Sequence, residues 1–172
     1  MAHYIIHAYD FPPLAGRALD AARRYAKIAP DSPHALHMPS HIFTRLGLWE
    51  DSIQSNLASA AAAQRYVATV ATGATSFDDL HAEDYLEYAY LQLGRDAEAR
   101  GVAERVARVE RLDVPNFAAA YALAAVPTRY AVERGKWSDA ARLEPRPSTF
   151  PWERFPNTEA ILLFGRALGA AR

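Results

Sequence analysis

The sequence predicts an all-α fold built from stacked helical hairpins. Three observations support this prediction. Apolar residues recur at spacings of three and four, which is the period of a helix with one buried face. Alanine is abundant, whereas the alternating pattern of a half-buried strand is nearly absent. Glycine and proline divide the periodic segments into units of helical length that are joined by short gaps.

The apolar period and the residues that interrupt it place the helices along the chain. We expect helices at residues 2–9, 14–28, 33–46, 50–71, 79–93, 96–111, 116–134, 137–143 and 156–170. Ser32 is expected to cap the third helix, with Pro33 in its first turn and Pro39 causing a bend. Either Asp78 or Asp79 is expected to cap the fifth helix.

Two segments are expected to be loops. Glu144–Pro156 contains four prolines, which remove backbone donors and prevent a continuous helix. In Thr69–Asp79, β-branched residues surround Gly73 and interrupt the helical period. Both segments therefore separate helices.

A turn signature recurs in "RLGLWEDSI", "QLGRDAEAR" and "ERGKWSDAA". In each copy a glycine ends one helix and a small residue follows five positions later. The glycines are Gly47, Gly94 and Gly135, and the small residues are Ser52, Ala99 and Ala140. Glycine can adopt the left-handed conformation that stops a helix. The small residue lets the next helix pack closely against the previous one.

A fourth copy, "LAGRALDAARRYAKIAPDSP", lacks the turn glycine. Ala18 lies 34 residues before Ser52, which is the period of the tetratricopeptide repeat, and Pro30 matches the proline that closes that repeat. The later spacings are longer. The sequence thus predicts one solenoid domain, residues 1–172, with hairpins at about 2–30, 33–68, 79–111 and 116–143, a connection at 144–156 and a final helix at 156–170.

The chain also resembles bacterial tetratricopeptide-repeat proteins of unassigned function that carry a HYxIH…HxLHMPSHI…RxGxW block. Here the block is "AHYIIHAYD" (Ala2–Asp10), "HALHMPSHIF" (His34–Phe43) and "RLGLW" (Arg45–Trp49), and the resemblance continues through "DDLHAEDYLEYAYLQLGR" and "FPWERFP". It implies a right-handed α-solenoid whose first helices line a concave face. It also implies that the chain is a fragment of a longer protein, and it implies no activity.

Composition excludes several classes of function. The 19 basic and 20 acidic residues nearly balance and form no basic run, so no nucleic-acid partner is expected. No apolar run has the length of a membrane span and no signal peptide is recognisable, so we expect no membrane partner and a cytoplasmic location. The absence of cysteine excludes disulfides, thiolate zinc sites and cysteine nucleophiles.

All six histidines fall in equivalent positions of the predicted hairpins. The 34-residue period relates His3 to His37 and His7 to His41, and the next spacing relates His34 to His81. These positions are separated by three and seven residues, so they share one face of the first helix of each hairpin. In a stacked array such faces lie side by side.

Two i, i+4 pairs on neighbouring helices could supply four imidazoles to one ion. We therefore expect His3, His7, His37 and His41 to be candidate ligands for zinc or another divalent transition metal. Asp84 could add a carboxylate or orient a ligand. The alternative is that these histidines are hydrogen-bonded packing residues, or that they contact a carboxylate ligand without any metal.

The same face predicts a ligand-binding groove. Its candidate residues are His34, His81, Asp84, Tyr88 and Arg129. No nucleophile elbow or phosphate-binding loop appears, so no catalytic residue is assigned. The favoured function is a scaffold or binding module for a peptide, protein or small molecule. The alternative is a metal site, which includes a metal-dependent enzyme, and a purely structural segment remains a third reading.

Other charged residues are expected to pair within the protein. Glu83 and Glu87 form an acidic i, i+4 pair that needs a neighbouring cation such as Arg45 or an arginine of an adjacent helix. The last predicted helix, "NTEAILLFGRALGAAR", resembles half of a hairpin. Its uncovered apolar face predicts self-association through this helix.

Overall fold

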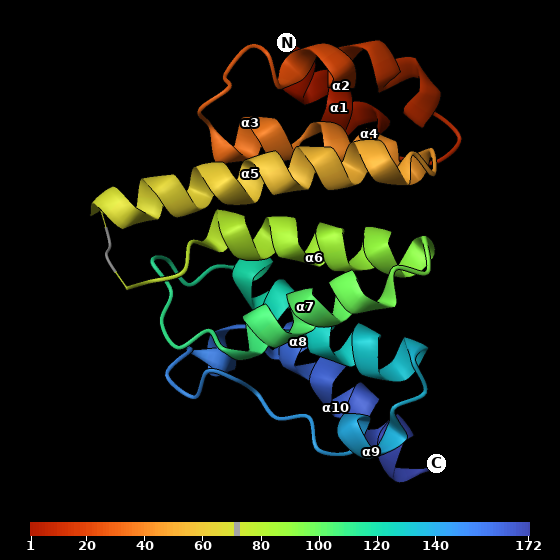
Figure 1. Ribbon diagram of the computed structural model, residues 1–172, viewed down its shortest axis with the longest axis vertical. Helices are drawn as coiled ribbons and strands as arrows, with labels where there is room; N and C mark the ends of the chain where they lie inside the picture. The colour runs from red at the N-terminus through yellow and green to blue at the C-terminus, as the bar shows by residue number, and fades with distance from the viewer. Residues whose placement is uncertain (71–72) are drawn as a thin grey trace.

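The computed structural model describes residues 1–70 and 73–172, and these residues form an all-helical fold (Figure 1). The α-helices are α1 (Ala2–Tyr9), α2 (Leu19–Tyr25), α3 (Pro33–His37), α4 (Pro39–Arg45), α5 (Trp49–Val70), α6 (Phe77–Gln92), α7 (Asp96–Ala107), α8 (Phe117–Glu133), α9 (Trp137–Ala140) and α10 (Pro156–Ala170). Short 3₁₀ helices cover Ala15–Ala18 and Trp152–Arg154. Within the described ranges, the β-type pairing consists of one isolated bridge between Thr75 and Leu112.

The helices follow one another along the long axis of the molecule (Figure 1). The N-terminus and the C-terminus lie at opposite ends of that axis. Helix α5 packs between α3 and α4 on one side and α6 on the other, and α6 in turn packs on α7 and α8. Helix α10 covers α8 and α9 at the C-terminal end. Helix α1 contacts α4 and α3 contacts α6, so side chains of these four helices can meet on a shared face.

The three predicted glycine turns are confirmed. Gly47, Gly94 and Gly135 have φ angles of 70°, 69° and 62°, in the left-handed region. At each turn the residue after glycine donates its backbone N–H to the carbonyl five positions earlier, as in a Schellman motif. The small residues that follow, Ser52, Ala99 and Ala140, are completely buried.

Proline and local capping adjust the predicted boundaries. Ser32 caps α3 as expected, since its Oγ accepts the N–H of Ala35. Pro39 has no N–H to donate, and the predicted helix 33–46 is divided there into α3 and α4. The predicted cap of the fifth helix was wrong. Ser76 caps α6 by accepting the N–H of Asp78, and Asp78 and Asp79 lie inside the first turn.

Three other boundaries differ from the prediction. The helix expected at 14–28 is a 3₁₀ turn followed by the shorter α2. The segment 137–143 keeps only one helical turn, and a 3₁₀ turn at Trp152–Arg154 interrupts the proline-rich connection. Residues 71 and 72, where the sequence predicts a helix end and part of a loop, lie outside the described residues.

Two buried apolar clusters hold the helices in place. The N-terminal cluster joins α1 to α4 through Ile6, Met38 and Ile42, each completely buried. The larger cluster runs from Ile53 on α5 to Leu162 on α10. None of the helices in the described part of the chain has the combined length and apolar character needed to cross a membrane. The first cluster fixes α1 and α4, the helices that carry His3, His7 and His41.

Candidate metal centre

The six histidines gather in one continuous cluster formed by α1, α3, α4 and α6. Across helix boundaries, the ring centroids of His3 and His34 lie 5.3 Å apart, and those of His7 and His41 lie 5.7 Å apart. His37 lies 4.2 Å from His81 by the same measure. Residues that are distant in sequence thus share a single imidazole surface.

The surface divides into two groups of three. In each group one nitrogen from every ring lies within 4.8 Å of the others. The inner trio is His37, His41 and His81, and the outer trio is His3, His7 and His34. The structure therefore does not bring the predicted ligands His3, His7, His37 and His41 together as one set. Two of them belong to each trio, and the groove candidates His34 and His81 complete the trios.

Hydrogen bonds determine which nitrogen carries the proton in the inner trio. The Asn56 side-chain N–H donates to the carbonyl of Ser52 at 2.8 Å, so its amide oxygen must face His37. That oxygen lies 2.7 Å from His37 Nδ1, which is therefore the donor. The carboxylate of Asp10 lies 2.9 Å from His41 Nδ1 and fixes the same tautomer there.

As a result, two unprotonated nitrogens face each other. His37 Nε2 and His41 Nε2 lie 3.1 Å apart, and each carries a lone pair once Nδ1 holds the proton. Protonation of His37 is unfavourable, because complete burial and the neighbouring His81 lower its pKa well below its usual value. Two imidazole nitrogens about 2.0–2.1 Å from a tetrahedral zinc ion are separated by about 3.3 Å. The observed spacing thus fits two ligands of one cation.

His81 adds the third imidazole from α6. Burial lowers the pKa of His81 to about 4, although the nearby Asp84 carboxylate acts in the opposite direction. The ring is thus neutral at physiological pH, which is the state that binds a metal. Because the inner trio combines converging nitrogens with the fixed tautomers of His37 and His41, its residues fit an imidazole-preferring ion such as zinc.

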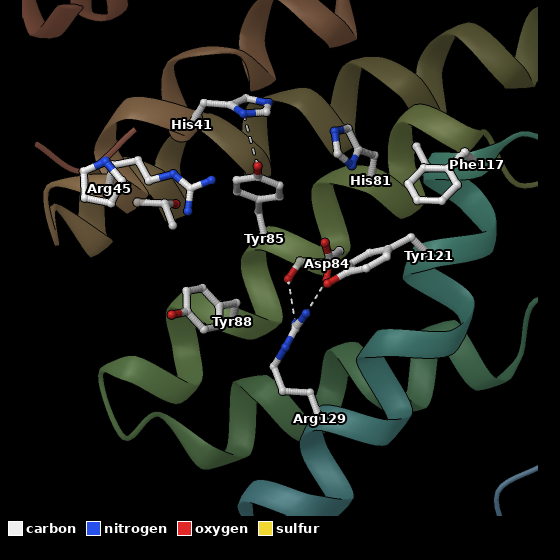
Figure 2. Close-up of a pocket in the computed structure, with 12 residues that line it drawn as sticks. His41, Arg45, His81, Asp84, Tyr85, Tyr88, Phe117, Tyr121 and Arg129 are labelled. Carbon is white, nitrogen blue, oxygen red and sulfur yellow. Dashed lines mark hydrogen bonds and ion pairs between the residues drawn. The ribbon is translucent and has the colours of Figure 1, made fainter. Parts of the chain in front are cut away.

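Tyr85 contacts the inner trio from the same face of α6. Its ring centroid lies 4.7 Å from that of His37, and its hydroxyl lies 3.2 Å from His41 Nδ1 (Figure 2). Burial raises the pKa of Tyr85 above its usual value, so the hydroxyl keeps its proton. The phenol can therefore donate a hydrogen bond to a molecule that enters the site.

A cavity of about 640 Å³ opens beside the inner trio (Figure 2). His41 and His81 form part of its wall, and aromatic side chains form much of the remainder. The lining residues are Pro12, His41, Thr44, Arg45, His81, Asp84, Tyr85, Tyr88, Phe117, Ala118, Tyr121 and Arg129. Its volume is in the range of small-ligand sites. A ligand in this cavity has direct access to two of the three candidate metal ligands.

A buried charge cluster closes the cavity opposite the histidines. Arg129 donates to Asp84 Oδ1 at 2.7 Å and to Glu87 Oε2, and only 18% of its side chain is exposed. The pKa of Arg129 is raised by both carboxylates, whereas burial raises the pKa of Glu87 to about 8. Tyr88 packs against the guanidinium, 5.4 Å from its ring centroid. Asp84, which the sequence suggested as a metal ligand or orienting group, thus binds Arg129 instead. Arg129, a predicted groove residue, is already paired with two carboxyl groups of the protein.

The predicted intramolecular pairing of Glu83 and Glu87 is confirmed. Glu83 accepts two hydrogen bonds from Arg105 of α7, and Glu87 accepts one from Arg129 of α8. Arg45 instead pairs with Asp10 at 2.7 Å. Glu83 and Glu87 are therefore each paired with an arginine from an adjacent helix.

Sequence reasoning missed Asp10, Asn56 and Tyr85 as site residues. The role of Tyr85 could have been predicted from the sequence, since Tyr85 follows His81 by four residues and shares its helical face. Asp10 ends the quoted histidine block, but its role depends on contact between α1 and α4. Asn56 lies within an alanine-rich helix, and nothing in the local sequence links it to His37.

Comparison of the chain with models of protein families, with curated proteins and with solved structures finds no match.

Proposed function

We propose that this protein binds a divalent transition metal ion through His37, His41 and His81 and presents it to a small ligand in the adjacent cavity. The observation that carries the proposal is the pair of Nε2 atoms 3.1 Å apart. Their Nδ1 protons are held by Asn56 and Asp10, so two neutral rings have no proton to place between these atoms. A cation between the two lone pairs turns this repulsion into coordination.

Three protein ligands leave a coordination position for water or another molecule. His41 and His81 line the cavity, so that position faces it. A bound zinc-like ion would supply a Lewis acid there and lower the pKa of coordinated water. Around it, Tyr85 offers a protonated hydroxyl and Arg45 offers a cation held by Asp10. This combination supports binding of an oxygen-containing small molecule and is compatible with metal-dependent catalysis.

A second candidate function is a metal-free binding module for a peptide or small molecule. Aromatic side chains at the cavity favour it, since Phe117 is 60% exposed and Tyr121 is 37% exposed. Exposed aromatic side chains on a concave surface are typical of recognition sites. Under this proposal the histidines supply polar contacts to the ligand and coordinate no ion.

We also propose that the helices form tetratricopeptide-like hairpins of a right-handed solenoid, related to the bacterial repeat proteins that the chain resembles. The recurring glycine turns, with a buried small residue five positions later, support this interpretation. So does the packing of the helices mainly against elements one or two positions away in chain order. In such an array the histidine face is one continuous binding surface.

The metal proposal is tested by zinc titration of protein purified without a histidine tag. We expect an equivalent of zinc that is lost in His81→Ala and in His37→Ala/His41→Ala. Tyr66→Ala, an exposed aromatic on α5, is the matched control and should leave binding unchanged. Far-UV circular dichroism verifies that each variant is helical. Absence of saturable zinc binding in folded wild-type protein, or retention of all binding in His81→Ala, would refute the proposal.

The metal-free candidate predicts a different result. A ligand recovered with the protein should remain bound after chelation of all metal, and Tyr121→Ala should release it. Retention by Tyr121→Ala, or release by chelation alone, excludes the metal-free candidate.

A further inference from the structure

We infer that a second metal ion binds at the outer trio, His3, His7 and His34, so that the histidine surface holds two ions side by side. This inference rests on the proposed function for the first ion but uses different ligands. It changes the nature of the centre. A pair of ions can share an anionic ligand and act on it together, whereas a single ion cannot.

The outer trio has the geometry of a three-imidazole site. His3 and His7 are separated by one turn of α1, and their ring centroids are 4.6 Å apart. His34 approaches from α3, with its Nε2 3.1 Å from His3 Nε2. This is the same nitrogen spacing as in the inner trio. An i, i+4 histidine pair completed by a third ligand from another element is a frequent way of building a metal site.

The partners of these rings leave their nitrogens available. Within residues 1–70 and 73–172, the structure shows no carboxylate or carbonyl oxygen hydrogen-bonded to the rings of the outer trio. His7 and His34 are also exposed, which gives an ion access from solvent.

The two trios are adjacent and rigidly linked. His7 lies 5.7 Å from His41, and His34 lies 6.4 Å from His37, both measured between ring centroids. Helix α1 is fixed by the completely buried Ile6 and by Asp10, which binds side chains of α4. Because both ends of this contact are anchored, the two groups of nitrogens cannot separate without breaking the N-terminal core.

Charge identifies the class of ligand that such a pair takes. All six imidazoles are neutral ligands, and Asp10 is the carboxylate that contacts one of them. Two divalent ions at this surface are thus poorly neutralised by the protein. Hydroxide or a small carboxylate that bridges the ions would offset this charge, as bridging oxygens do in two-metal sites. The cavity beside His41 and His81 gives such an anion a route to the centre.

The test measures how many zinc ions bind per chain and uses histidine substitutions to assign each ion to one trio. Wild-type protein should bind two equivalents, with the outer one weaker because its ligands are exposed. His7→Ala/His34→Ala should lose the outer equivalent and keep the inner one, whereas His81→Ala should lose the inner equivalent and keep the outer one. Tyr4→Ala, an exposed neighbour of His3 on α1, is the control and should keep both.

Three outcomes are distinguished. One equivalent in wild type, lost in His81→Ala and unaffected in His7→Ala/His34→Ala, overturns the second site and leaves the proposed function intact. One equivalent weakened by both sets of substitutions means a single ion on all six histidines and also overturns it. Two Co²⁺ ions per chain that show spin coupling in electron paramagnetic resonance support the paired centre, whereas two uncoupled ions overturn the pairing.

Discussion

The Nδ1 atom of His41 lies 2.9 Å from Oδ2 of Asp10, so a residue at the end of α1 orients a histidine of α4. The other carboxylate oxygen, Oδ1, accepts from Arg45 Nε at 2.7 Å. These bonds hold the pKa of Asp10 below its usual value, although burial acts in the opposite direction. Asp10 therefore remains charged and fixes the His41 ring with Nε2 toward His37.

Removing this carboxylate should weaken zinc binding without removing a ligand. Partners that orient ligating histidines typically contribute about 10- to 100-fold in metal affinity. We expect a loss of that size in Asp10→Ala, measured by competition with a chromogenic chelator. Asp10→Asn keeps an oxygen that can accept from His41 and should retain more affinity. Equal affinity in wild type and Asp10→Ala would contradict the orientation that we assign to His41.

Asn56 is expected to play the same role for His37, from inside the core. Asn56→Leu removes the acceptor of the Nδ1 proton and leaves the imidazole free to change tautomer. Zinc affinity should fall about 10- to 100-fold. Gln54→Ala, on an exposed part of the same helix, is the control and should bind zinc as wild type does. An Asn56→Leu protein that is helical and binds zinc normally would show that the tautomer of His37 is fixed by something else.

Arg129 is expected to be essential for stability because it donates hydrogen bonds to two buried carboxyl groups, those of Asp84 and Glu87. Arg129→Ala leaves Asp84 and Glu87 without their cation, and breaking a buried pair in this way costs about 3–5 kcal/mol. Arg142→Ala removes a pair with Asp139 in which both side chains are largely exposed, so its cost should be about 1 kcal/mol or less. Urea unfolding of both variants checks the contrast. Similar costs would mean that the Arg129 cluster is solvated.

The sequence predicted those features that depend on local signals. Gly47, Gly94 and Gly135 could be assigned to helix ends because few other residues adopt a positive φ. The histidine face followed from helical period and repeat spacing alone. The division into two trios did not, because it depends on how α1 crosses α3 and α4 on either side of the bend at Pro39.

Long-range polar contacts were beyond sequence reasoning for a physical reason. Asn56 meets His37 only because α5 packs against α3, and Arg129 meets Asp84 across 45 residues. A residue's helical face can be predicted from its neighbours in sequence, whereas its partner depends on the packing of another helix. The capping error at Asp78 has a local cause instead, because Ser76 lies two residues earlier and accepts the N–H of Asp78.

The contribution of His81 to the stability of the metal-free protein should decrease as the pH falls from about 6.5 to about 4. Burial lowers the pKa of His81 to about 4 in the folded protein, whereas the unfolded chain keeps the ordinary histidine value of 6.5. Between these values the unfolded chain takes up a proton that the folded protein does not, so acid favours unfolding. At 1.36 kcal/mol per pKa unit, the contribution of His81 is roughly 3 kcal/mol. The pKa of Glu87 is raised to about 8, which acts in the opposite direction as the pH falls.

Comparison with His81→Gln isolates this contribution, because Glu87 is unchanged in both proteins. The difference in free energy of unfolding between wild type and variant should change by a few kcal/mol from pH 7 to pH 4.5. Saturating zinc should stabilise the wild type at pH 7.5 and much less at pH 5, since protons compete for the same imidazoles. Zinc should stabilise His81→Gln less at either pH. A pH-independent difference between the two proteins would show that His81 is already solvated and protonates freely, which is incompatible with a neutral ligand held ready for an ion.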